Sequence, residues 1–262
     1  MLNISSDYRC IFCLSGNGPF KRKEHIIPES LGNDDFVLRP GLVCDPCNQY
    51  FGTEVEQRVL NSPPFSLERI AASVKTKKGR LPNTTLDSKL KLSATGFLDS
   101  IMIEGNPDNL IWTIGNNEYL IVPPQQSAFD NIYFARFFLK IGLEALANES
   151  KVDVYSSVFD KARNFARFAK QNMIWDVGYA IYPNRDDLII SERSDEIGPL
   201  VKHQLYQYEI GQMFSGDFIL SFVYRTHIFA CNLTSPDLSE YVRSFNLIND
   251  IKLKLISQYS NK

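Results

Sequence analysis

Two Cys-x2-Cys pairs near the N-terminus constrain the fold of this chain most strongly. The pairs are Cys10/Cys13 and Cys44/Cys47, and Cys231 is the fifth and last cysteine. Four thiolates at about 2.3 Å from a zinc ion form a closed tetrahedral site, which stabilises structure but offers no coordination position to a substrate. We therefore expect the two pairs to bind one structural Zn2+ ion between them.

The segment between the two cysteine pairs carries residues suited to metal-assisted hydrolysis. It contains Lys23-Glu24-His25-Ile26-Ile27-Pro28, and Asn48 directly follows the last cysteine of the pairs. A neutral imidazole such as that of His25 can accept a proton from water near neutral pH. The oxygens of Glu24 and Asn48 are hard ligands that suit Mg2+ or Mn2+. The pattern indicates phosphodiester hydrolysis at a site that zinc assembles.

The order of these motifs resembles that of the HNH endonucleases with a zinc-stabilised ββα-metal finger. The resemblance covers about residues 8–60 of the chain. It implies that His25 is the general base and that Glu24 and Asn48 bind the catalytic Mg2+ or Mn2+. It also implies DNA as the partner and substrate, with RNA not excluded. Many such nucleases act in restriction or phage defence, which extends the expectation to those roles.

One part of the family pattern lacks an evident counterpart in this sequence. Many HNH nucleases have a middle asparagine that braces the loop carrying the histidine. Counting back from Asn48 leads to Arg39, and Asn33 lies earlier than the pattern would place it. The resemblance therefore leaves open which residue braces the loop that carries His25.

The remainder of the chain predicts an α+β fold with antiparallel strands and two long helices. We expect an HNH finger at residues 1–62, a connector at 63–87 and an α+β accessory domain at 88–262. The finger helix starts near Asn48, with an apolar stripe of Phe51, Val55 and Val59. Further predicted helices cover 66–73, 130–148, 155–171 and a segment from about 235. Predicted strand segments are 36–38, 41–43, 89–97, 100–104, 110–115, 118–122, 174–181, 188–190, 205–210, 218–224 and 227–232.

Basic residues near the finger are candidates for contact with nucleic acid. The formal net charge is −2, so a basic surface must be local. We expect phosphate contacts from two clusters that flank the finger motifs. The residues are Lys21, Arg22, Lys23, Lys75, Lys77, Lys78 and Arg80. A further stripe on the helix predicted at 155–171 is read as a solvated face, and it consists of Arg163, Arg167 and Lys170.

Other polar and aromatic residues are expected to serve in packing. His203, His227 and Cys231 have no ligand pattern beside them. A second set of side chains alternates along two predicted strands and suits a sheet core rather than a platform for stacking bases. This set consists of Tyr206, Tyr208, Phe218, Phe222 and Tyr224.

The composition is that of a folded globular protein, with 44% hydrophobic and 22% charged residues. No apolar stretch reaches the roughly 20 residues of a membrane span, so we expect a cytoplasmic protein without a membrane partner. Two alternatives to an active nuclease remain. In the first, the finger is a zinc-stabilised module that binds nucleic acid without cutting it. Alternatively, residues 88–262 restrain the nuclease until they bind a ligand, a regulatory partner or a second copy in a homo-oligomer.

Overall fold

The computed structural model describes most of the chain. The described ranges are 8–76, 78–86, 90–105, 111–114, 117–120, 131–149, 152–169, 173–182, 189–195, 198–203 and 205–258. Two of the basic residues named above, Lys77 and Lys170, lie outside them. Within these ranges, no helix combines the length and the apolar character that crossing a bilayer requires.

The finger helix begins directly at the second cysteine pair. Helix α1 (Asp45–Tyr50) has Cys44 as its N-cap and a proline in its first turn, so it starts three residues before the predicted position. It continues through a wider π-helical segment (Phe51–Glu56) into α2 (Gln57–Leu60). The apolar stripe of Phe51, Val55 and Val59 is buried, as predicted.

The two strand segments predicted at 36–38 and 41–43 do not pair with each other. The segment 36–38 lies instead along the residues around His25, with an antiparallel bridge between His25 and Val37. The Leu38 amide donates to the Glu24 carbonyl at 2.9 Å, while Leu42 accepts from the Ile11 amide at 2.8 Å. This pairing connects the Glu24–His25 segment to the chain that leads into α1.

The second half of the chain is built around an antiparallel sheet with the strand order β12-β6-β11-β10-β9. The fold class is α+β, as predicted. The bounds are β6 Val177–Ile181, β9 Tyr206–Gln212, β10 Phe218–Tyr224, β11 His227–Asn232 and β12 Lys254–Leu255. The strands predicted at 218–224 and 227–232 match β10 and β11 at both ends.

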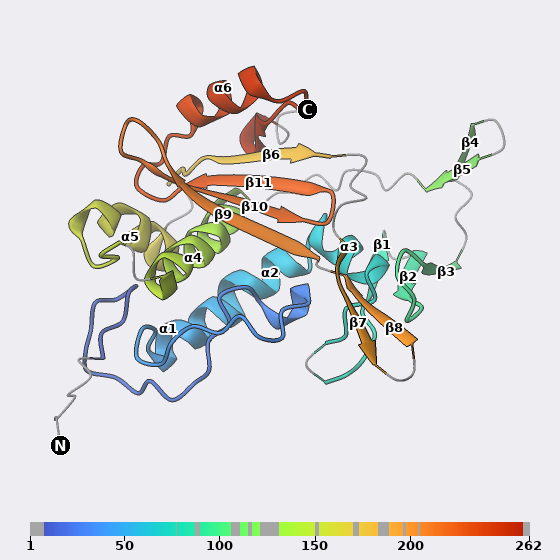
Figure 1. Ribbon diagram of the computed structural model, residues 1–262, viewed down its shortest axis with the longest axis horizontal. Helices are drawn as coiled ribbons and strands as arrows, with labels where there is room; N and C mark the ends of the chain where they lie inside the picture. The colour runs from blue at the N-terminus through green and yellow to red at the C-terminus, as the bar shows by residue number, and fades with distance from the viewer. Residues whose placement is uncertain are drawn as a thin grey trace.

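Helices cover both faces of this sheet (Figure 1). Side chains that alternate along β10 explain the arrangement, because Phe222 and Tyr224 join the main apolar core while Ile219 packs in a separate cluster. Helix α6 (Ser239–Ile248) covers the Ile219 face. The predicted core role of Phe222 and Tyr224 is confirmed, since both are buried.

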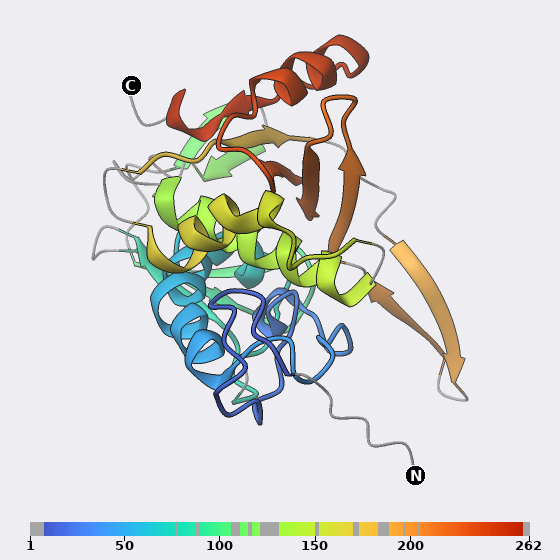
Figure 2. The same ribbon diagram turned by 90° about the vertical axis from the view of Figure 1, so that its left-hand side faces the viewer.

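Helix α4 (Asn131–Glu149) lies between the sheet and the finger, and α5 (Asp160–Phe168) packs beside it (Figures 1 and 2). Every residue of α4 from Phe134 to Ala147 is buried. The Phe138 ring lies 4.8 Å from that of Phe229 in β11, measured between centroids. The finger, α4 and the sheet share one apolar cluster. The division into residues 1–62, 63–87 and 88–262 stays a prediction.

Shorter elements complete the fold. Helix α3 (Phe65–Ala71) follows the finger, near the helix predicted at 66–73. It contacts β1 and β2 of a three-stranded sheet, and two separate hairpins, β4–β5 and β7–β8, complete the described strands. Their bounds are β1 Asn83–Leu86, β2 Leu90–Ala94, β3 Ile101–Gly105, β4 Ile111–Ile114, β5 Asn117–Leu120, β7 Ile189–Asp195 and β8 Gly198–His203. Strand β8 had no counterpart among the predicted strands.

Candidate active site

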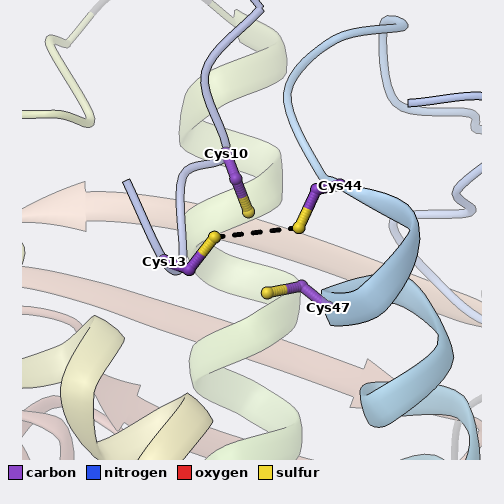
Figure 3. A group of neighbouring side chains, drawn as sticks. All are labelled: Cys10, Cys13, Cys44 and Cys47. Atoms are coloured by element: carbon purple, nitrogen blue, oxygen red, sulfur yellow. Dashed lines mark hydrogen bonds between the residues drawn. The ribbon is translucent and has the colours of Figure 1, made fainter. Parts of the chain in front are cut away.

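The four cysteines of the two pairs converge on one point. Their sulfur atoms all lie within 4.8 Å of one another, and the Sγ atoms of Cys13 and Cys44 are 3.7 Å apart. Figure 3 shows the thiols converging from the first cysteine loop and from the start of α1. A tetrahedral site with Zn–S bonds of about 2.3 Å has sulfur–sulfur separations of roughly 3.8 Å. The donor set and its spacing therefore fit a structural Zn2+ ion.

The thiols of the cluster also affect one another electrostatically. A hydrogen bond from Cys47 lowers the pKa of Cys10 to about 5. The same bond raises the pKa of Cys47, and burial raises that of Cys44 to about 11. Cys10 is therefore the most acidic of these three thiols. A zinc ion binds thiolates, so its binding would release the remaining protons.

Helix α5 supports the zinc centre from outside. Arg163 is buried and donates to the Ile11 carbonyl at 3.2 Å, which ties α5 to the first cysteine loop. Arg167 lies against Cys47, and its guanidinium stands 3.7 Å from the Tyr50 ring centroid. The solvated face predicted for this stripe is therefore wrong at Arg163, because tertiary contacts bury its guanidinium.

His25 lies in the segment that pairs with 36–38, with its side chain only 9% exposed. Its Nε2 atom is 3.1 Å from Oε1 of Glu29, which follows in a short 3-10 turn. Glu29 was not among the predicted site residues, although its i,i+4 spacing from His25 was a signal for it.

Asn48 reaches back to the segment that carries Glu24 and His25. Its Nδ2 atom donates to the Lys23 carbonyl at 3.3 Å, next to the Glu24 peptide. Because the side-chain nitrogen of Asn48 makes this bond, the side-chain oxygen of Asn48 takes no part in it. The helix that begins at the zinc centre thus brings Asn48 beside the Glu24–His25 segment.

Asn33 braces the loop between His25 and the segment 36–38. It is buried, and its Nδ2 donates to the Ile27 carbonyl at 2.5 Å and to the Phe36 carbonyl at 3.0 Å. Its Oδ1 accepts from the Phe36 amide at 2.8 Å and from the Tyr206 hydroxyl at 3.1 Å. Asn33 therefore supplies the bracing that the sequence pattern did not assign.

Residues 10–64 match the family model described as HNH endonuclease. This segment is an HNH endonuclease domain. The match covers the zinc centre, the Glu24–His25 segment and Asn48, and such a domain implies a nucleic-acid substrate and a nuclease-type function. Neither the comparison with curated proteins nor the comparison with solved structures gives a match.

A buried lysine from α4 contacts the HNH domain at Glu24. Lys140 is fully buried, and its Nζ atom lies 2.6 Å from Glu24 Oε1, 2.9 Å from Glu56 Oε1 and 3.1 Å from Glu144 Oε2. It also donates to the His25 carbonyl at 3.0 Å. Burial lowers the pKa of Lys140, but the three carboxylates outweigh it and hold the pKa well above its usual value. Burial raises the pKa of Glu144.

The sequence of α4 contains a pattern of charged residues that indicates this contact, although the many apolar residues of the helix make it hard to see. Arg136, Lys140 and Glu144 recur at i, i+4 and i+8, which places them on one side of α4. Arg136 donates to the Tyr50 hydroxyl and to the Ala166 carbonyl, so the first two residues of the stripe contact the HNH domain. The side of α4 that carries these charged residues is therefore buried, like its apolar side.

The basic residues predicted to contact nucleic acid lie on the surface of the HNH domain and beyond it. Lys21, Arg22 and Lys23 are exposed, and Asp45 Oδ1 accepts hydrogen bonds from the first two backbone amides at 2.8 and 2.9 Å. The described members of the second cluster, Lys75, Lys78 and Arg80, are also exposed. Their role in binding stays a prediction.

His227 and Cys231 match the predicted packing role, whereas the side chain of His203 lies outside what the structure describes. His227 Nδ1 lies 2.9 Å from the Tyr179 hydroxyl, and its Nε2 lies 3.0 Å from Glu68 Oε1. Cys231 is fully buried, away from the zinc centre. His203 is the last residue of β8.

Proposed function

We propose that this chain is a metal-dependent endonuclease that hydrolyses phosphodiester bonds in DNA. The hydrogen bond between Asn48 and the Lys23 carbonyl carries the proposal, because it ties the Asn48 side chain to the backbone of the segment that contains Glu24 and His25. RNA remains an alternative substrate, since the chemistry does not require a 2′-hydroxyl. By resemblance, the proposal extends to restriction or phage defence in the cytoplasm.

In the proposed mechanism, His25 accepts a proton from the attacking water. Glu29 stabilises the imidazolium that forms, from a distance of 3.1 Å. Glu24 and Asn48 would hold Mg2+ or Mn2+, which when bound supplies charge stabilisation for the phosphate and the leaving oxygen. Because one HNH domain carries one proposed general base, we expect each cleavage event to nick one strand.

Cleavage of supercoiled plasmid tests the proposal directly. With Mg2+ or Mn2+ present, the zinc-loaded protein is expected to convert supercoiled plasmid into the nicked form, and EDTA is expected to stop the reaction. Asn48→Ala removes one proposed oxygen ligand and should raise the Mg2+ concentration needed for half-maximal rate by about tenfold or more. Binding of plasmid without cleavage under every ion would favour the binding-module alternative.

Lys140 acts in this account as a positioning residue for Glu24 and His25. Replacing Lys140 by methionine leaves Glu24, Glu56 and Glu144 facing one another without a cation. We expect Lys140→Met to lower the free energy of unfolding by about 3–5 kcal/mol, the usual cost of breaking a buried ion pair. Urea denaturation measures this loss.

The exposed lysine Lys161 on α5 provides the matched control. Lys161→Met should change the free energy of unfolding by no more than about 0.5 kcal/mol. Equal stability of both variants would contradict the role given to Lys140. Because α4 supports the Glu24–His25 segment, we expect residues 88–262 to assist the nuclease rather than restrain it.

A further inference from the structure

A cavity of about 800 Å3 borders the HNH domain on the side of α2, α3 and β1. These elements lie next to one another in Figure 1. The volume falls within the range of about 300–1,000 Å3 that is typical of small-ligand sites. The cavity therefore has the size of a binding site for a small group such as a nucleotide.

Basic side chains dominate the charge of this cavity. Arg69, Lys78 and Arg80 line it, against the single acid Glu56 among the described lining residues. Arg69 donates through Nη1 to the Leu60 carbonyl at 3.1 Å. Its Nε atom is buried without a hydrogen-bond partner, and within the described ranges no ion pair compensates its charge. Burial lowers the pKa of Arg69. An uncompensated guanidinium of this kind suits an anionic ligand.

The cavity borders the groups that we propose to be catalytic. Ser30 lines it and directly follows Glu29, whose carboxylate contacts His25. Glu56 also lines it and shares the ammonium of Lys140 with Glu24. Through Ser30 and Glu56, the cavity therefore borders the residues that we propose to cleave the phosphodiester.

We infer that this cavity binds an unpaired nucleotide beside the phosphodiester that is cut, so that the protein prefers substrates with single-stranded segments. The inference rests on the proposed function. The cavity has the volume of a site for one small ligand and not for a double helix, whose major groove alone is about 12 Å wide. Gln57, Asn61 and Asn83 offer amide groups to base edges. The lining that the structure describes contains no aromatic side chain, so hydrogen bonds rather than stacking select the base.

Fluorescence anisotropy with the full-length, zinc-loaded protein tests this inference. The His25→Ala background and the absence of Mg2+ separate binding from cleavage. The probes are a short single-stranded DNA and a duplex of the same sequence. The double variant Lys78→Ala/Arg80→Ala alters two exposed side chains, and Lys161→Ala/Arg243→Ala removes the same charge from exposed positions on α5 and α6.

The cavity variant should bind the single strand roughly tenfold more weakly and the duplex with nearly unchanged affinity. Its slope of log K against log salt should fall by about 1.4, which corresponds to about 0.7 for each lost phosphate contact. The control variant should keep the wild-type affinity for both probes and the wild-type salt slope. Unchanged single-strand binding, or an equal loss for both probes, overturns the inference. Selective binding by a wild-type protein that never cleaves would refute the proposed function and leave the cavity site standing.

Discussion

Replacing His25 by alanine is expected to slow plasmid nicking by about 10^2–10^4-fold, the usual contribution of a general base. The expected loss is in kcat, because the imidazole acts on water and does not hold the phosphate. Glu29→Gln should give a smaller loss, since its carboxylate stabilises the imidazolium from 3.1 Å without taking the proton. Initial rates at saturating Mg2+ measure both effects.

Zinc content and circular dichroism provide the controls for this experiment. His25→Ala should keep the stoichiometric zinc and the wild-type spectrum, because the four cysteines, and not His25, form the cluster that fits a zinc ion. A variant that retains its fold and still nicks plasmid within about twofold of the wild-type rate would exclude His25 as the base.

Cys47→Ser is expected to abolish zinc retention and to unfold the HNH domain. Structural zinc contributes about 10–16 kcal/mol in small zinc-finger peptides at neutral pH, so loss of one thiolate removes much of the stability of such a segment. Cys47 stands in the first turn of α1, which also carries Asn48. Loss of the zinc centre would therefore also separate Asn48 from Lys23.

Metal analysis and thermal unfolding measure this effect. Cys231→Ala provides the matched control, because Cys231 is a buried thiol in β11 outside the zinc centre. The control should keep its zinc and lose only the packing of one small side chain. Retention of stoichiometric zinc and of the wild-type Tm by Cys47→Ser would contradict the structural role of the metal.

Local patterns were sufficient to predict the zinc centre and several elements. Two identical cysteine spacings predicted the cluster, and two short runs rich in apolar residues predicted β10 and β11 with both ends. The apolar stripe from Phe51 to Val59 likewise predicted the finger helix. Within each cysteine pair, each strand and the finger helix, the residues that determine the structure lie within a few positions of one another.

Contacts between distant segments were not predictable from such patterns. Asn33 braces a loop through backbone carbonyls, which leave no trace in the sequence. Lys140 meets Glu24 only because α4 packs between the sheet and the HNH domain, 116 positions further along the chain. We predicted that Arg163 is solvated because its partner, the Ile11 carbonyl, comes close to it only in the folded chain.

We propose that Glu24 and Asn48 hold a divalent ion beside His25. Crystals of the zinc-loaded protein soaked in Mn2+ reveal such an ion by anomalous scattering, recorded at a wavelength that distinguishes manganese from zinc. We expect a manganese ion coordinated by oxygens of Glu24 and Asn48, near the His25 ring. Manganese absent from that position, at concentrations that support cleavage in solution, would contradict it.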